Sequence, residues 1–272
     1  MVQVADAPAV LPRMIRRGPK LATRTTSPRL SVVIVNYCQW ENTAALVRQL
    51  RRSPALRGGD VEIVVVDNHS PRHKLARQVR RWSGVSLRRW GRNRGFARAV
   101  NEGARLSRGD WFLLLNPDMS IDGGFLQGAL ELAEQLENSE PTAGVVGFRL
   151  RNSDGSRQLS TGSFPTLPGT LAGLARPRAE RKYRRTPLEQ RSRVPWVTGC
   201  CLLVRGDCWR ELGGFAEDFF LYYEDVDLCR RARARGWSVW FEPNLEGVHH
   251  NPIHARAVPP ALRLVTRHSL LT

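Results

Sequence analysis

Short apolar segments alternate with amphipathic segments through the first 150 residues of this 272-residue chain, and the alternation limits the folds it can adopt. Val, Ile and Leu dominate four segments, which span 29–37, 61–67, 110–118 and 143–150. Strands that are apolar on both faces are typical of parallel sheets. Segments with one apolar helical face separate them, at 41–52, 72–82, 95–107 and 123–136, with a short strand at 85–90. The pattern predicts an α/β fold with a doubly wound sheet.

The regular pattern is interrupted between residues 153 and 195. This region is rich in Pro, Gly, Ser and Arg, and we interpret it as a long surface loop with short helices, of the kind that is usually functional or mobile. The alternation then resumes with strands at 196–204 and 237–243 on either side of a helix. The expected organisation has three parts: a flexible basic arm at 1–28, one domain at 29–258, and a short C-terminal helix or tail at 259–272.

The chain is strongly basic, with 42 Lys and Arg residues against 25 Asp and Glu and a formal charge of +17. Residues 72–108 alone hold twelve Lys or Arg residues and a single acid, Glu102. Such a surface attracts nucleic acid, anionic membranes or phosphorylated small molecules, and charge alone does not choose among them. Because the sequence contains no recognisable RNA- or DNA-binding motif, a nucleic-acid-binding protein is the weaker alternative.

The spacing of the cysteines and the length of the apolar runs indicate the cellular compartment in which we expect the protein. The five cysteines show no C-x-x-C spacing, and two are adjacent, which suits neither a disulfide framework nor a zinc site. We expect reduced, mostly buried cysteines, as in a cytosolic protein. Apolar runs stay well short of the ~20 residues that span a bilayer. The expected location is therefore cytoplasmic, with peripheral contact at the inner face of the membrane as a further expectation.

Polar side chains follow three of the predicted strands at the point where each ends: Asn36, Asp67, and Asn116 with Asp118. The carboxyl ends of strands in an open parallel sheet form the ligand-binding edge. Asp118 on a strand-end turn is suited to a hard divalent cation, Mg²⁺ or Mn²⁺. Gly95 opens a helix and is flanked by arginines, an arrangement that favours phosphate.

Three carboxylates, Glu224, Asp225 and Asp227, lie within four positions at the start of a predicted helix. Acids in the first turn of a helix and arginines in its last turn complement the helix dipole. Asp227 can also pair with Arg230 or Arg231 at i+3 or i+4. The helix alone therefore accounts for Asp227 and could account for all three, so a structural and a catalytic interpretation both stay open at this point.

Six segments occur in the order seen in family 2 glycosyltransferases, and together they most resemble the bacterial rhamnosyltransferase-like members. They are SVVIVNY (31–37), VVVDNHS (64–70), NRGFARAVNEG (93–103), LLLNPD (113–118), the segment 199–237 and VHH (248–250). The resemblance covers about residues 29–250. It implies a GT-A fold, a mostly parallel central sheet flanked by helices. It also implies a nucleotide-sugar donor (dTDP-rhamnose or a UDP-sugar), a divalent metal, and inversion at the anomeric carbon.

The resemblance also implies site residues. Those implied to bind the nucleotide sugar are Asn36, Tyr37, Asp67, Asn93, Arg94, Gly95, Asn116 and Asp118. Asn116-Pro117-Asp118 occupies the D-x-D position, where Asn replaces the first Asp, so Asp118 becomes the main carboxylate ligand of Mg²⁺ or Mn²⁺. His249 matches a metal-contacting histidine, with His250 as the alternative.

For the chemical step, Glu224-Asp225 matches the family's E-D pair, with Asp225 as the catalytic base. Trp196, Gly199 and Glu224 are placed on the acceptor side, next to the loop 153–195. A late Arg267 is matched with the region of the diphosphate.

The sequence also contains a false signal for a processive synthase. Gln78-Val79-Arg80-Arg81-Trp82 spells Q-x-x-R-W, but it precedes the D-x-D position instead of following the E-D pair. We therefore expect a non-processive enzyme that adds one sugar, L-rhamnose being one candidate, to a hydroxyl of a cell-envelope glycan or lipid-linked acceptor. A different nucleotide sugar or acceptor remains the alternative.

Overall fold

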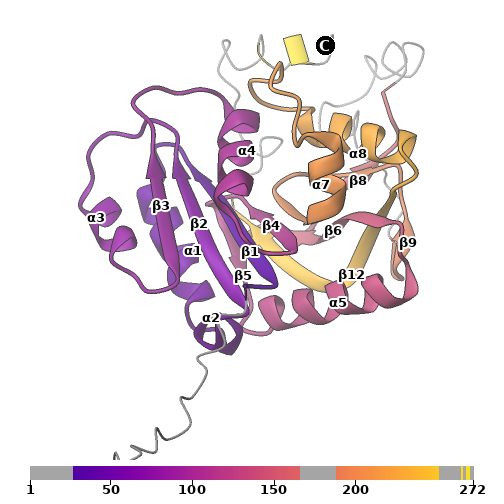
Figure 1. The fold of residues 1–272 in the computed structure, drawn as a ribbon, viewed down its shortest axis with the longest axis horizontal. Helices are drawn as coiled ribbons and strands as arrows, with labels where there is room; N and C mark the ends of the chain where they lie inside the picture. The colour runs from indigo at the N-terminus through magenta and orange to yellow at the C-terminus, as the bar shows by residue number, and fades with distance from the viewer. Residues whose placement is uncertain (1–26, 166–187, 251–264, 266–267, 270–272) are drawn as a thin grey trace, which may run out of the picture.

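The computed structural model describes residues 27–165 and 188–250, together with residues 265, 268 and 269 (Figure 1). Most of the predicted basic arm and of the C-terminal segment 259–272 lies outside these residues, as do positions 166–187 of the predicted long loop. Arg267 also lies outside them. The expectations for those parts of the chain therefore stay predictions.

The N-terminal half of the sheet is parallel. Its strands lie in the order β3 (Val85–Arg89), β2 (Val61–Asp67), β1 (Leu30–Asn36) and β4 (Trp111–Leu115). Every residue of β1 is buried, as its uninterrupted apolar sequence predicts. Asn36 stands opposite Asp67 in the register, so the two strands end side by side at the same edge of the sheet.

The C-terminal half of the sheet mixes strand directions. Beyond β4 the order continues with β11 (Cys201–Arg205), β6 (Ala143–Arg151), β12 (Ser238–His249) and β5 (Met119–Ile121). β12 is parallel to β6, whereas β11 and β5 are antiparallel to their neighbours. Short strands complete the described part: β7 (Arg157–Gln158) on β6, β9 (Ser192–Arg193) on β12, and a separate ribbon of β8 (Thr161–Gly162) with β10 (Trp196–Val197). The expectation of a mostly parallel central sheet is confirmed.

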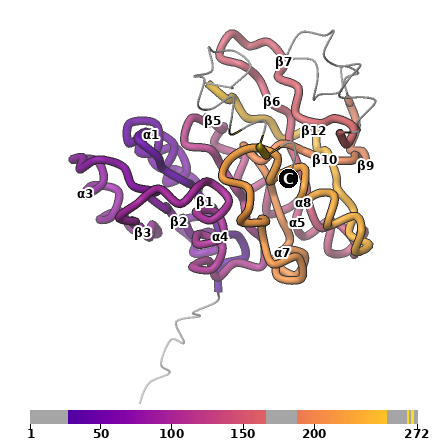
Figure 2. The backbone as a smooth tube through the Cα atoms, turned by 90° about the horizontal axis from the view of Figure 1, so that it is seen from above, coloured from indigo at the N-terminus to yellow at the C-terminus, as the bar shows by residue number. Residues whose placement is uncertain are grey.

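Helices cover both faces of this sheet (Figures 1 and 2). One apolar core contains side chains of α1 (Trp40–Leu50), α2 (Pro54–Gly58), α3 (Lys74–Arg80) and α5 (Phe125–Ser139). The other contains side chains of α4 (Phe96–Leu106), α7 (Gly206–Leu212) and α8 (Glu224–Ala234). Alternate residues of β1 point into the two cores, Val32 and Ile34 into the first and Val33 and Val35 into the second.

Helix α4 packs unusually close to β1 because Gly103 faces the strand. A Cβ atom at Gly103 would lie 2.3 Å from Cγ1 of Val33. At the other end of the helix, Gly95 adopts a φ of +90°, and a Cβ there would lie 2.8 Å from the carbonyl oxygen of Phe220. Both glycines therefore permit close approaches: Gly103 lets α4 pack against β1, and Gly95 lets the amino end of α4 approach the loop that precedes α8.

Candidate active site

A closed polar network joins the carboxyl ends of β1 and β2. Asn36 Nδ2 donates to Asp67 Oδ1 at 2.8 Å and to Ser70 Oγ at 2.9 Å. The Ser70 backbone N–H and the Arg89 guanidinium also donate to the Asp67 carboxylate, at 3.2 and 2.7 Å. Asn36 and Asp67 are both fully buried. In this structure their side chains fix the loop after β2, while Tyr37, the residue after Asn36, is 48% exposed.

The loop before α4 is shaped by the side chain of Asn68, which the sequence did not single out. Asn68 Oδ1 accepts from the Arg94 N–H at 2.9 Å, and its Nδ2 donates to Asn93 Oδ1 at 2.9 Å and to the Gly95 carbonyl at 3.1 Å. Asn93 Oδ1 accepts in turn from the Gly95 N–H at 2.9 Å. The predicted residues Asn93, Arg94 and Gly95 are thus brought next to the β2 loop by one buried amide.

Asp118 and His249 form a close buried pair. β5 begins directly after Asp118, and its antiparallel pairing with β12 places His249 opposite Met119. The His249 Nε2 atom lies 3.4 Å from Asp118 Oδ1, and both side chains are about nine-tenths buried. Asn116 precedes them and donates its backbone N–H to the Cys200 carbonyl at 2.9 Å. The structure therefore brings together two residues that are 131 positions apart in the sequence.

His250 occupies a different environment from His249. It is exposed, and its two ring nitrogens lie 2.7 Å from Ser120 Oγ and 3.0 Å from Ser153 Oγ. Its backbone N–H donates to the Asp118 carbonyl at 2.9 Å. Both ring nitrogens of His250 therefore have hydroxyl partners, whereas Nε2 of His249 faces the Asp118 carboxylate.

Glu224 and Asp225 open helix α8, and both are buried. The Gly199 N–H donates to Asp225 Oδ2 at 3.0 Å, and the Val226 N–H donates to Oδ1 at 2.9 Å. A Cβ atom at Gly199 would lie 3.3 Å from Cβ of Asp225, so a glycine lets the loop approach the carboxylate. Asp225 is therefore held in one orientation by backbone donors from two segments.

Left-handed backbone conformations gather at the same edge. Among the described residues, the non-glycine positions with positive φ are Cys38, His69, Tyr222 and Tyr223. Cys38 and His69 lie two residues after β1 and β2, and the two tyrosines immediately precede Glu224. Each such residue costs roughly 1–2 kcal/mol, and strain of this kind clusters at functional sites. The loops that contain these strained residues also contain residues of the candidate site.

The backbone of Gly199 and Cys200 contacts both acidic segments. The Gly199 N–H donates to Asp225 Oδ2, and the Cys200 carbonyl accepts from the N–H of Asn116, two residues before Asp118. Burial is the main cause that raises the pKa of the Cys200 thiol to about 12, and the negative charges of Asp118 and Asp225 contribute to it, against a hydrogen bond with Thr198 that lowers it. Four of the five cysteines are buried, as the sequence predicts, and none forms a disulfide in this structure.

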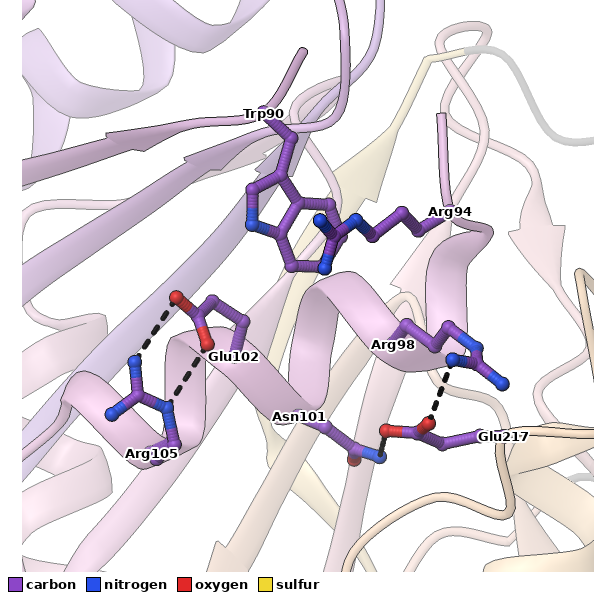
Figure 3. Close-up of a pocket in the computed structure, with 7 residues that line it drawn as sticks. All are labelled: Trp90, Arg94, Arg98, Asn101, Glu102, Arg105 and Glu217. Atoms are coloured by element: carbon purple, nitrogen blue, oxygen red, sulfur yellow. Dashed lines mark hydrogen bonds and ion pairs between the residues drawn. The ribbon is translucent and has the colours of Figure 1, made fainter. Parts of the chain in front are cut away.

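A polar pocket of about 210 Å³ lies along one side of α4 (Figure 3), and neither Asp118 nor Asp225 is among the residues that line it. Arg94 stacks on Trp90 there, 4.8 Å from the ring centre, and Arg98 forms an ion pair with Glu217 at 3.2 Å. Asn101 donates to the Phe215 carbonyl at 2.9 Å. These contacts tie α4 to the loop before α8, so we assign the pocket a supporting role.

Two predicted acceptor-side residues have structural roles here. Trp196 is fully buried, and its indole N–H donates to the Ser163 carbonyl at 2.9 Å. The Trp196 side chain therefore packs in the interior and does not line an open surface. Gly199 contributes through its backbone, as described for Asp225. Sequence reasoning missed Asn68, Asn101 and Gln158; the first two lie within resembling segments, whereas Gln158 lies in the irregular region, where no pattern marked it.

Sequence comparison relates the chain to known transferases. A family model described as glycosyl transferase family 2 matches residues 31–213. The N-acetylglucosaminyl-diphospho-decaprenol L-rhamnosyltransferase of Mycobacterium tuberculosis is 33% identical over 226 residues, covering 76% of this chain and 72% of that protein. The rhamnosyltransferase WbbL of Escherichia coli is 26% identical over 162 residues, covering 59% of this chain and 60% of that protein.

Solved structures share the fold. A mannosyltransferase from Pyrobaculum calidifontis, in complex with GDP-Man and Mn²⁺, superposes with a TM-score of 0.57 at 21% identity, over 84% of this chain and 59% of that one. The transferase GalNAc-T7, with UDP, GalNAc and Mn²⁺, gives a TM-score of 0.63 at 18% identity, over 89% of this chain and 46% of that one. The expected GT-A architecture is thereby confirmed. Among the described residues, no helix combines the length and the apolar character that a membrane crossing requires.

Proposed function

This chain belongs to glycosyl transferase family 2, and on that basis we propose that it transfers a single sugar from a nucleotide-diphosphate sugar to a hydroxyl group, with inversion. The observation that carries the proposal is that the Asp118–His249 pair and Asp225 are linked by one short segment: the Gly199 N–H donates to Asp225, and the carbonyl of Cys200 accepts from Asn116, two residues before Asp118. A cation-binding pair and a separate carboxylate are the groups that such a transfer needs, one for the leaving diphosphate and one for the attacking hydroxyl.

Asp118 and His249 fit a divalent cation. Neighbouring ligands of an octahedral ion with bonds of about 2.1 Å lie about 3.0 Å apart, close to the 3.4 Å between Asp118 Oδ1 and His249 Nε2. The described residues contain no cluster of three or more His, Cys, Asp or Glu side chains suited to a metal. The site therefore suits an ion that takes its remaining ligands from the donor diphosphate and water. When bound, Mg²⁺ or Mn²⁺ would neutralise charge on the leaving diphosphate.

Asp225 is the proposed general base. Inversion requires the acceptor hydroxyl to attack on the side opposite the leaving nucleotide and to lose its proton as the new bond forms. The backbone donors from Gly199 and Val226 fix the Asp225 carboxylate at the amino end of α8. Glu224, adjacent and equally buried, is proposed to face the acceptor.

The nucleotide is proposed to lie across the ends of β1 and β2. Tyr37 is the exposed aromatic ring at this edge, and Arg94 supplies positive charge near the amino end of α4. Asp67 and Asn36 are proposed to hold the loop that receives the base, because their polar atoms already bind Ser70 and Arg89. Asn93, Gly95 and Asn116 shape the loops through their backbones and amides.

We propose L-rhamnose as the sugar and a lipid-linked glycan as the acceptor, because the relatives from M. tuberculosis and E. coli are named as rhamnosyltransferases and the first is named for a diphospho-decaprenol acceptor. One-sugar transfer is supported by Trp82 of the Q-x-x-R-W string. The guanidinium groups of Arg48 and Arg51 on α1 lie over its ring, 5.4 and 5.3 Å from the ring centre. Trp82 packs against the apolar core that contains α1, whereas α8 belongs to the core on the other face of the sheet.

A thermal-shift screen of nucleotide sugars with Mn²⁺ tests the donor. A ligand at 100 times its Kd stabilises the native state by about 2.7 kcal/mol, which corresponds to roughly 5–10 °C for a domain of this size. We expect dTDP-rhamnose with Mn²⁺ to give the largest rise, and the sugar without Mn²⁺ to give a smaller one. A larger rise with a UDP- or GDP-sugar would overturn the choice of donor, and no rise with any nucleotide sugar would contradict the proposed function.

Peripheral membrane contact is proposed for a cationic surface on α3. This α3 surface consists of Arg72, Lys74, Arg77, Arg80 and Arg81, which are all exposed. None of the five forms an ion pair with another described residue, in contrast to Arg89, Arg98 and Arg105. Basic residues near an anionic bilayer contribute about 1 kcal/mol each. We therefore expect the protein to sediment with vesicles that contain phosphatidylserine, and not with neutral vesicles.

A triple variant, Arg77→Ala with Arg80→Ala and Arg81→Ala, tests the location of this contact. We expect it to lower the vesicle partition coefficient by roughly 10²-fold at low salt. A matched variant, Arg193→Ala with Arg205→Ala and Arg210→Ala, removes the same charge from ion-paired positions and should bind almost as the parent does. Equal losses in the two variants would show that only net charge matters and would contradict the assignment to α3.

A further inference from the structure

Gln158 lies against the proposed metal pair and comes from a part of the chain that carried no site prediction. It belongs to β7, and its pairing with Leu150 of β6 fixes its backbone. The Gln158 amide nitrogen lies 3.0 Å from His249 Nδ1, and both side chains are buried. The opposite ring nitrogen of His249 faces Asp118. A chain of contacts therefore runs from Gln158 through the imidazole to the carboxylate.

The orientation of the Gln158 amide determines which ring nitrogen of His249 can bind a cation. With the amide nitrogen donating to Nδ1, the ring proton sits on Nε2 and points toward Asp118. If Oε1 faces Nδ1 instead, Nδ1–H donates to it, and the lone pair of Nε2 is free for a metal ion. Metal-binding histidines commonly donate their other N–H to an oxygen acceptor in this way.

Little opposes rotation of this amide. Its Oε1 atom is buried and makes no hydrogen bond to any described residue. Exchanging the oxygen and nitrogen ends changes the shape of the side chain very little. Among the described residues, His249 is the one hydrogen-bond partner that the Gln158 side chain would lose. The same buried group can therefore donate to His249 in one state of the site and accept from it in another.

We propose that Gln158 is a positioning residue that switches between these orientations: its amide nitrogen donates to His249 Nδ1 in the metal-free site, and its Oε1 accepts from Nδ1–H when Mg²⁺ or Mn²⁺ is bound. This inference rests on the proposed metal site of Asp118 and His249. It assigns to the irregular region after β6 a part in nucleotide-sugar binding, through the cation that joins the donor diphosphate to the protein.

Titration of Mn²⁺ with nucleoside diphosphate present, followed by the electron paramagnetic resonance signal of free Mn²⁺, tests the proposal without any turnover. Loss of a residue that orients a ligand typically lowers metal affinity 10–100-fold, and we expect Gln158→Ala to do so. Gln158→Glu should retain most of the affinity, because a carboxylate can only accept from Nδ1–H. The control Gln127→Ala removes an exposed glutamine that bonds Glu131 on α5, and it should bind as the parent does.

The Glu variant separates the proposed role from a merely structural one. If Gln158 serves only as a donor that braces the His249 ring, both variants should weaken Mn²⁺ binding alike, and that result would overturn the inference. Unchanged affinity in Gln158→Ala would also overturn it while leaving the metal site intact. If the unmodified protein takes up no Mn²⁺ with nucleoside diphosphate, the proposed metal site fails together with this inference.

The ring tautomer gives a second readout, which holds even if Gln158→Ala folds poorly. Nitrogen-15 NMR of the histidine rings, assigned with His249→Asn, distinguishes a protonated Nδ1 from a protonated Nε2. In the unmodified protein, Mg²⁺ with nucleoside diphosphate should move the His249 proton from Nε2 to Nδ1. A proton that stays on Nε2 in the metal-saturated protein would contradict the proposed switch.

Discussion

Replacing Asp225 by Asn is expected to lower kcat by about 10²–10⁴-fold, the usual contribution of a general base. The amide keeps the shape of the side chain but cannot take a proton from the acceptor hydroxyl. Because the proposed role of Asp225 is to accept a proton from the acceptor hydroxyl and not to bind the nucleotide, the Kd of the donor should change little. Single-turnover transfer and donor titration on the same protein measure the two quantities separately.

Asp227→Asn is the matched control, two residues along the same helix. Asp227 pairs with Arg231 at 2.7 Å, as its i+4 spacing predicts, and Arg231 also donates to the carbonyls of Leu212 and Gly214. Its role is therefore to hold α8 against the end of α7. We expect a loss of roughly 0.2–1 kcal/mol in the free energy of unfolding and nearly normal kcat. Loss of turnover in folded Asp227→Asn, with normal turnover in Asp225→Asn, would reassign the base.

Removing the divalent cation should have a comparably large effect. A metal that neutralises a leaving group contributes several kcal/mol to the transition state, so excess chelator should lower kcat/KM by about 10²-fold or more. Asp118→Asn should reproduce most of this loss and weaken the Mn²⁺ dependence of donor binding, because the amide is a poorer ligand than the carboxylate. Activity measured against free Mn²⁺ concentration in the two proteins tests both statements.

The exposed Asp122 provides the control for Asp118. Its side chain accepts from the Gly124 N–H at 2.8 Å before α5, and an Asn there can still accept that bond. Asp122→Asn should therefore show the same Mn²⁺ dependence as the unmodified protein. Full activity of the unmodified enzyme in excess chelator would contradict the proposed role of Asp118 and His249.

The parallel half of the sheet could be predicted from the sequence because its strands are buried on both faces. Segments such as 61–67 contain few of the polar residues that alternate with apolar ones in a half-exposed strand. The observed β2 has the predicted bounds. Predicted strand 237–243 continues instead to His249, since its later residues pair with both β6 and β5. Strand β5 has three residues, too few for an alternation of apolar and polar residues to be recognised in the sequence.

The same difference, between patterns that are local in the sequence and pairings that depend on the tertiary fold, decides which site residues could be predicted. Polar strand ends indicated Asn36, Asp67 and Asp118 from physical reasoning alone, since parallel strands end at one edge. The proximity of His249 depends on β5 pairing with β12 and followed only from the family resemblance. The burial of Trp196 and the hydrogen bonds of Asn68 and Gln158 depend on tertiary packing, which no local pattern encodes. Net charge alone could not decide whether the chain binds nucleic acid or a phosphorylated donor. The match to glycosyl transferase family 2 favours the donor.

The anomeric configuration of the product tests the central claim most directly. The protein would be incubated with Mn²⁺, dTDP-rhamnose and an N-acetylglucosaminyl-diphospho-polyprenol acceptor, and the one-bond carbon–hydrogen coupling at the anomeric centre of the transferred sugar would be read by NMR. Direct attack by a hydroxyl that Asp225 deprotonates gives a product whose anomeric configuration is opposite to that of the donor. Transfer with retained configuration would contradict the account, because it would require a mechanism other than a single displacement assisted by Asp225.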